Sequence, residues 1–178
     1  MKRIFMTAIL FPLFLIDKPA QGYQVNPDIL HNHLVKYSEF NRFLSDIRVR
    51  ESGNKYFKIN PFGYIGAYQF GQSALSSLGI RLTANEFSHD STLFLPSHQD
   101  ETAKKWFVLL EKRLTADIRK HEGDTVNGQK ITKSGILAAG HLAGITGVKR
   151  YFRTARDPAD INGTRLTDYL IEFSGYNF

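Results

Sequence analysis

The sequence predicts a mainly α (α+β) fold, in which a single helical domain carries one small, irregular β-hairpin. Apolar side chains recur at helical spacing in several segments, whereas apolar and polar residues alternate over 55–60, before a Pro-Phe-Gly break. The chain has 178 residues, of which 42% are hydrophobic, and this is enough to bury one core. It contains no internal repeat or low-complexity tract, so we expect no second domain.

Residues 1–22 have the three parts of a secretory signal peptide: a basic start, an apolar run over 4–16 and a small-x-small cleavage site at 20–22. A membrane anchor is the alternative interpretation. The apolar run is interrupted by Pro12, however, and is too short to span a bilayer comfortably. We therefore expect residues 23–178 to form the domain and to be periplasmic or secreted, without a stable membrane anchor after cleavage.

Charge, cysteine content and motifs limit the possible functions. The formal net charge of +6 suits an anionic cell wall, and it suits nucleic acid equally well. The chain has no cysteine, which excludes disulfides and thiolate chemistry. Its six histidines are scattered, and it contains no H-E-x-x-H, G-x-x-x-x-G-K-S/T or G-x-S-x-G motif. We therefore expect no metal site, no cofactor and no nucleophilic triad.

The first helices are predicted from their caps. A proline in the middle of 26–28 marks one helix start, and Ser38 is expected to cap a second helix that ends at Gly53. The apolar face of this second helix consists of Phe40, Phe43, Leu44 and Ile47. Glu51 follows Ile47 by four residues, so its side chain is expected to continue this face instead of pointing to bulk water.

The segment 55–71 is aromatic and rich in glycine. Its two alternating stretches flank a break at 61–63 and predict the hairpin. Three of its aromatic residues are expected in the core: Phe57, Phe62 and Phe70. Gly66 and Gly71 bracket the four residues 67–70, so the backbone there can approach a ligand closely. The polar members of this stretch are therefore either ligand contacts or part of the core packing.

Further helices are predicted after this segment. Their expected caps or first residues are Ser73, Thr83, Ser97, Thr132 and Thr164. The longest of them, which Gly123 follows, carries one apolar stripe made of Ala103, Phe107, Leu110, Leu114 and Ile118. A polar, turn-rich loop is expected over 124–129. Small residues in the helix after this loop, Gly135, Ala138, Ala139 and Gly140, allow close packing against neighbouring helices.

Glu51 is the candidate acid of a sugar-cleaving enzyme. A glycosidic bond breaks when its bridging oxygen is protonated, so such an acid has to keep its proton near neutral pH. A carboxyl at a helix C-terminus faces the negative end of the helix dipole, and aromatic neighbours desolvate its charged form; both effects favour the protonated acid. Arg48 and Arg50 act in the opposite direction if they point at it. The alternative is an ordinary surface glutamate.

Three ordered segments carry a resemblance to a known family: Glu-Ser-Gly at 51–53, Gly-Ala-Tyr-Gln-Phe-Gly at 66–71 and Ala-Ala-Gly-His-Leu-Ala-Gly at 138–144. They resemble the E-S, G-L-M-Q and A-Y-N-x-G signatures of the lysozyme-like lytic transglycosylases, and particularly the phage- and secretion-associated peptidoglycan hydrolases with a G-x-Y-Q-F-G segment. The resemblance runs over 26–178 and implies a lysozyme-like, two-lobed helical domain.

The resemblance also implies roles for individual residues. Glu51 matches the catalytic acid, and Ser52 either orients its carboxylate or satisfies the last carbonyls of the helix. Tyr68 and Gln69 match residues that line the saccharide cleft. His141 stands where the family has tyrosine, and it is either a hydrogen-bond donor in the site or a structural residue. The residue after it is leucine where the family has asparagine, and this departure leaves the detailed mechanism open.

The implied reaction is that of a peptidoglycan lytic transglycosylase. Glu51 protonates the bond between N-acetylmuramic acid and N-acetylglucosamine, then accepts the C6 hydroxyl proton and leaves an anhydro-sugar. The alternatives are a hydrolytic muramidase, which needs a second carboxylate, and a non-catalytic peptidoglycan-binding protein. The expected partners are peptidoglycan glycan strands, with a secretion apparatus or an immunity protein as further options and no nucleic acid. We expect a monomer.

Overall fold

The computed structural model describes residues 26–160 and 162–178, and the predicted signal peptide lies outside these residues. The described chain is mainly helical, as predicted. Its elements are α1 (Pro27–Ser52), α2 (Gln72–Ser77), α3 (Ala84–His89), the 3-10 turn η1 (Ser91–Phe94), α4 (Pro96–His121), β1 (Thr125–Val126), β2 (Gln129–Lys130), α5 (Lys133–Thr154) and α6 (Leu166–Glu172). Within the described residues, no helix combines the length and the apolar character that crossing a membrane requires.

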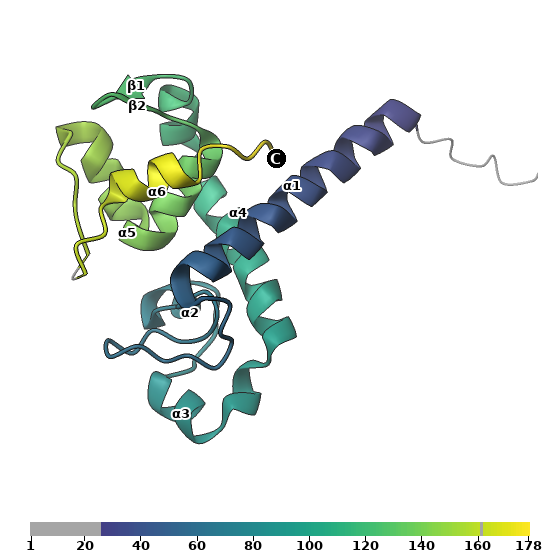
Figure 1. Ribbon diagram of the computed structural model, residues 1–178, viewed down its shortest axis with the longest axis vertical. Coiled ribbons are helices and arrows are strands. Elements are labelled where there is room, and N and C mark those ends of the chain that lie inside the picture. The colour runs from purple at the N-terminus through teal and green to yellow at the C-terminus, as the bar shows by residue number, and fades with distance from the viewer. Residues whose placement is uncertain (1–25, 161) are drawn as a thin grey trace, which may run out of the picture.

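Helix α4 runs through the middle of the molecule. Helices α2 and α3 and the segment 54–71 lie around one end of it, and α5, α6 and the strands lie around the other (Figure 1). The predicted apolar stripe of α4 is buried, together with Trp106 beside it. The predicted cap at Ser97 is wrong by two residues: Leu95 is the N-cap, and Pro96, whose fixed φ suits the first residue of a helix, is already helical.

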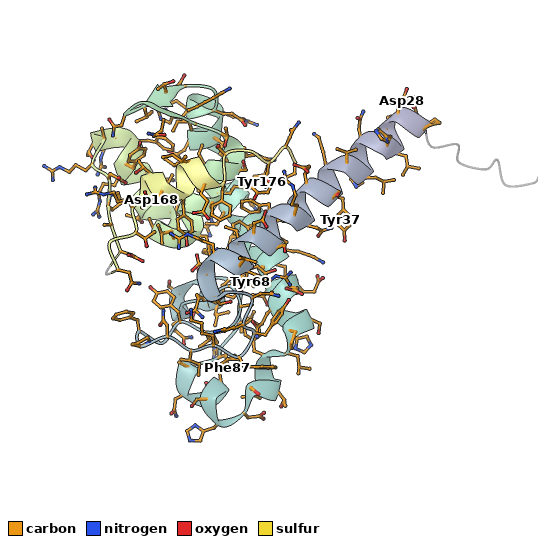
Figure 2. The ribbon with its side chains drawn as sticks, viewed as in Figure 1. Asp28, Tyr37, Tyr68, Phe87, Asp168 and Tyr176 are labelled. Atoms are coloured by element: carbon orange, nitrogen blue, oxygen red, sulfur yellow. The ribbon has the colours of Figure 1, made fainter. Side chains whose placement is uncertain are left out.

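Helix α1 is one continuous helix, so the prediction of a second helix starting at Ser38 is wrong. Neither glycine nor proline interrupts the chain after Pro27, and the Asn26 side chain caps the start by accepting from the Asp28 N–H at 2.9 Å. The inner half of α1 buries its apolar face, whereas the same face is exposed in the outer half, at Ile29, Leu30, Leu34 and Tyr37. Figure 2 shows Asp28 and Tyr37 on this projecting half.

The end of the chain packs against the inner half of α1. The Tyr176 hydroxyl donates to Asp46 Oδ2 at 2.6 Å, and the Phe178 ring lies 5.0 Å and 5.1 Å from the rings of Phe40 and Phe43. Figure 2 shows Tyr176 beside this helix. The C-terminal segment therefore holds in place the half of α1 that ends at Glu51.

The predicted hairpin at 55–66 is present only as a reversal of the chain. Ile59 and Ile65 form an isolated antiparallel bridge, and Asn60 Oδ1 accepts the backbone N–H groups of Phe62 and Tyr64, which fixes the turn between them. The expectation that Phe57 and Phe62 belong to the core is wrong, because 59% and 52% of these residues are exposed. The third phenylalanine, Phe70, is fully buried as expected.

The two-stranded antiparallel sheet, β1 with β2, lies where the sequence predicted a loop. Its turn consists of Asn127 and Gly128, which both have positive φ, at 51° and 76°. Asn-Gly is the preferred pair for a two-residue hairpin turn, because both residues tolerate this conformation. The hairpin signal was therefore present in the predicted loop.

Helices α5 and α6 pack closely, as the small residues predicted. A methyl group on Gly135 would lie 2.5 Å from the Leu170 carbonyl oxygen, so only glycine allows this approach. Thr132 caps α5 by accepting from the Gly135 N–H at 3.1 Å, as predicted, whereas α6 begins one residue later than a Thr164 cap requires, with Arg165 as its N-cap. This packing fixes α6 relative to the centre of the molecule.

Candidate functional site

A cleft of about 850 Å³ opens beside the C-terminal end of α1. Its walls come from α1, the segment 58–69, the middle of α5, residues Asp160, Asn162 and Thr164, and α6. The ionisable and amide side chains that line it include Arg50, Glu51, Lys58, Gln69, His141, Asp160 and Tyr169. Three of the predicted site residues, Glu51, Gln69 and His141, therefore meet in one cavity, although they come from distant parts of the sequence.

Glu51 is mostly buried at the mouth of this cleft, since only 15% of its side chain is exposed. The α1 helix ends one residue later, because Gly53 takes a left-handed conformation and its N–H caps the carbonyls of Arg48 and Val49. Glu51 Oε1 accepts a hydrogen bond of 2.7 Å from the Tyr169 hydroxyl. The carboxyl therefore continues the buried face of the helix, as its spacing from Ile47 predicted.

The two arginines that flank Glu51 in the sequence are directed to other carboxylates. Arg48 donates to Asp100 Oδ1 at 3.1 Å, and Arg50 donates to Glu172 Oε2 at 3.0 Å. The Arg50 guanidinium also lies 5.4 Å from the centre of the Tyr169 ring. Neither arginine therefore forms an ion pair with Glu51, although Arg50 lines the same cleft.

Tyr169 is the functional residue that sequence analysis missed. It lies on α6, and only 2% of it is exposed. Burial, and next the neighbouring Glu51 carboxyl, raise the pKa of the Tyr169 hydroxyl, so it remains a hydrogen-bond donor at neutral pH. A buried tyrosine hydroxyl needs a polar partner, and that requirement is the signal that could have identified it.

His141 lines the cleft and is at the same time part of a buried hydrogen-bond chain. Its Nδ1 accepts from the Trp106 indole N–H at 3.1 Å, and its Nε2 lies 2.9 Å from the carbonyl oxygen of Tyr68. The same Nε2 is 3.7 Å from Glu51 Oε1, and only 5% of the His141 side chain is exposed. Of the two alternatives left open by the sequence, these bonds support a structural residue, and the role as a donor in the site stays a prediction.

Tyr68 does not offer its ring to the cleft, so this prediction is wrong. Only 1% of the residue is exposed, and its hydroxyl donates to Asp100 Oδ1 at 3.0 Å. Figure 2 shows Tyr68 below the lower end of α1, and its ring is part of the buried core. The contribution of Tyr68 to the site is its backbone carbonyl, which accepts from His141.

Gln69 lines the cleft as predicted, but its amide is also used to hold the local turn. Its Nε2 donates to the Gly66 carbonyl at 2.8 Å, and its backbone has a positive φ of 49°. Backbone hydrogen bonds in both directions between Ile65 and Phe70, of 3.1 Å and 2.9 Å, close the turn. This geometry directs Gln69 to the cleft and Tyr68 to the core.

Ser52 completes the helix end instead of orienting the carboxylate. Its hydroxyl donates to the Arg48 carbonyl at 3.2 Å and accepts from the Lys55 N–H at 2.9 Å. Only 5% of the residue is exposed, and it is not among the residues that line the cleft. Of the two roles open for it, the structure supports the capping role.

Asp160 is the other carboxylate that lines the cleft. Its Oδ1 accepts the backbone N–H groups of Asn162 and Thr164, each at 2.8 Å, and this holds the loop on which it lies. Asp100, by contrast, accepts from Arg48, Tyr56 and Tyr68 and is not part of the lining. Within residues 26–160 and 162–178, no group of three His, Asp or Glu side chains is placed to hold a metal ion.

The cleft thus combines one mostly buried carboxyl, a tyrosine hydroxyl that donates to it, a histidine ring nearby, and two cationic side chains on its walls. Such an arrangement can transfer a proton to a ligand and then stabilise the carboxylate that remains. Comparisons with models of known protein families, with curated proteins and with solved structures found no match for this chain.

Proposed function

We propose that this chain is a peptidoglycan lytic transglycosylase, in which Glu51 is the single acid and base. The observation that carries this proposal is the position of the Glu51 carboxyl, which is 15% exposed, faces a cleft of about 850 Å³ and accepts from the Tyr169 hydroxyl at 2.7 Å. We also propose that the elements at the two ends of α4 correspond to the two lobes of a lysozyme-like domain, with the glycan strand bound between them.

The hydrogen bonds around Glu51 suggest how the proton is handled. Tyr169 occupies Oε1 as a donor, so the transferable proton of the neutral acid belongs on Oε2. After Oε2 has protonated the bridging oxygen, the carboxylate is stabilised by the hydrogen bond from the Tyr169 hydroxyl, while His141 Nε2 lies nearby at 3.7 Å and donates to the Tyr68 carbonyl. The carboxylate can then accept the proton of the C6 hydroxyl, which returns the acid to its starting form.

The walls of the cleft suit an anionic glycan. Arg50 and Lys58 line it, and the Lys58 ammonium group lies 3.3 Å from the backbone carbonyl of Glu51. Phe62 and Tyr64 line it as well and are partly exposed, so aromatic surface is available to a sugar ring. In this proposal they take over the stacking role that the sequence assigned to Tyr68.

Replacing one oxygen of the acid tests the proposal. Glu51→Gln keeps the shape and can accept from Tyr169, but it cannot supply the proton. We expect purified wild-type protein to release soluble muropeptides from sacculi, and Glu51→Gln to release none while it still sediments with them. Glu101→Gln, on the exposed surface of α4, is the matched control and should keep full activity. Sedimentation without release by wild type would favour the non-catalytic glycan-binding alternative.

A hydrolytic muramidase is the second candidate, and Asp160 is the observation that favours it, because two-carboxylate glycosidases need a second carboxylate across the cleft. Asp160→Asn separates the two, since the asparagine oxygen can still accept from Asn162 and Thr164. We expect this variant to retain activity and to give anhydro products, about 18 Da lighter than hydrolysed ones in mass spectra. Loss of activity in this variant, together with hydrolysed products from wild-type protein, would establish the muramidase.

A further inference from the structure

We propose that Trp106 is a positioning residue, which keeps His141 as a neutral donor and thereby prevents an ion pair between His141 and Glu51. This inference rests on the proposed function of Glu51 as an acid. It starts from the Trp106 indole, whose N–H lies 3.1 Å from His141 Nδ1. An indole nitrogen can only donate, so Nδ1 has to be the unprotonated, accepting nitrogen.

The other ring nitrogen is determined in the same way. His141 Nε2 lies 2.9 Å from the Tyr68 carbonyl oxygen, which can only accept, so Nε2 carries the proton. Each nitrogen of the imidazole therefore faces a partner of fixed and opposite type. A second proton on Nδ1 would point at the indole N–H, and it would break a hydrogen bond inside the protein.

Burial raises the free-energy cost of breaking either hydrogen bond of the imidazole. Only 6% of Trp106 and 5% of the His141 side chain are exposed, so water has little access to replace a lost hydrogen bond. The rings of Phe70 and Phe107 lie 5.8 Å and 5.5 Å from the imidazole. Neither of these rings can solvate an imidazolium as water does.

The neighbouring carboxyl of Glu51 acts in the opposite direction, and this is why the hydrogen bond from Trp106 is needed. Glu51 Oε1, 3.7 Å from Nε2, would favour an imidazolium and would then itself be held as a carboxylate. The Tyr169 hydroxyl contacts the same Glu51 oxygen, and the cations Arg50 and Lys58, which line the same cleft, disfavour an imidazolium. A carboxylate paired with an imidazolium has no proton to donate, so the proposed reaction requires a neutral His141.

Removing only the indole N–H tests the proposal. Trp106 is the single tryptophan of the chain, so it can be replaced during expression by β-(3-benzothienyl)alanine, which keeps the ring shape and lacks the N–H. Trp106→Phe is the simpler variant. Nitrogen-15 NMR reports the protonation state of each His141 ring nitrogen directly. We expect the neutral Nε2–H form in wild type at pH 6, and a larger imidazolium fraction in both variants.

Activity provides a second readout. Muropeptide release by the variants should fall at pH 5.5 relative to wild type and recover as the pH rises, because the ratio of protonated to neutral imidazole falls about tenfold with each pH unit. Adding His141→Gln to Trp106→Phe should remove the acid-side fall, measured relative to the double variant's own rate at neutral pH, since glutamine takes no charge.

Two results would overturn the proposal: an imidazolium or an Nδ1–H tautomer in wild-type protein, or variants whose NMR spectra and pH profiles match wild type. The NMR result does not depend on catalysis. If wild-type protein cleaves no glycan, the proposed function fails, while the ring nitrogens still decide the role of Trp106.

Discussion

Gln99 holds together the segment from which much of the cleft wall is made, and its replacement should be strongly destabilising. Its side chain is fully buried on α4. Its Oε1 accepts from the Ala67 N–H at 2.8 Å, and its Nε2 donates to the carbonyls of Tyr56 and Phe94 at 2.9 Å and 2.7 Å. One amide thereby joins three turns of backbone that no sheet connects.

In Gln99→Leu, all three backbone groups lose their partner. An unsatisfied buried group costs about 1–3 kcal/mol, and burial of the leucine side chain returns about 1.5 kcal/mol. We expect a net loss of about 3 kcal/mol, which corresponds to a melting temperature about 6–12 °C lower for a chain of this size. Gln99→Glu should be at least as harmful, because a carboxylate faces two carbonyl oxygens.

Urea denaturation measures this loss, with circular dichroism as the signal. Gln72→Leu, on the exposed first turn of α2, is the matched control and should change the free energy of unfolding by less than about 0.5 kcal/mol. If Gln99→Leu costs less than about 1 kcal/mol, the backbone groups find other partners and Gln99 does not hold the segment.

Three further predictions concern the site and its support. Tyr169→Phe removes the donor to Glu51 and should lower muropeptide release about 10- to 100-fold, with an unchanged circular dichroism spectrum; unchanged release would show that the acid does not need this donor. Gly135→Ala should cost about 1–3 kcal/mol in urea denaturation, because the added methyl overlaps a carbonyl of α6, whereas Gly175→Ala, with open space around it, should cost little; equal values would contradict the packing. Burial raises the pKa of Tyr68 and of Tyr169, so the stability that they contribute is complete below pH 10 and is lost as the pH rises further, by about 1.4 kcal/mol per pH unit for each. Urea midpoints at pH 9, 10 and 11 measure this, and a constant midpoint would refute it.

Features that depend on near neighbours in the sequence were predicted well. The capping box at Thr83 forms, with Glu86 Oε2 accepting from the Thr83 N–H at 2.8 Å. The stripe of α4 and the small residues of α5 also follow the prediction, because a helix that crosses the core needs one apolar face and close neighbours. Periodicity and capping describe these interactions almost completely.

Local signals failed where two of them competed or where one was overlooked. Ser38 has the residue type of a cap, but the helix already running from Pro27 continues through it, since extending a helix costs less than starting a new one. At 127–128, the Asn-Gly turn signal was present and the sheet followed from it. Phe57 and Phe62 are hydrophobic yet exposed, which hydrophobicity alone does not reveal.

The candidate site was predicted in its main residue but not in its connections. The position of Glu51 follows from a four-residue spacing, whereas its partner Tyr169 is 118 residues away. The inward direction of Tyr68 depends on the left-handed backbone of Gln69 and on a hydrogen bond to Asp100 on another helix. No pattern within one segment carries such information, because it arises only when distant segments pack together.

The bond between Glu51 and Tyr169 joins the first helix of the described chain to the last one. Contacts so distant in sequence are the most costly in loop closure and tend to form late in folding. Until α6 docks, the carboxyl at position 51 remains hydrated and has no enclosed groove around it. A partly folded chain would therefore be inactive, and the peptidoglycan cleavage proposed for this protein would begin only after α6 has docked.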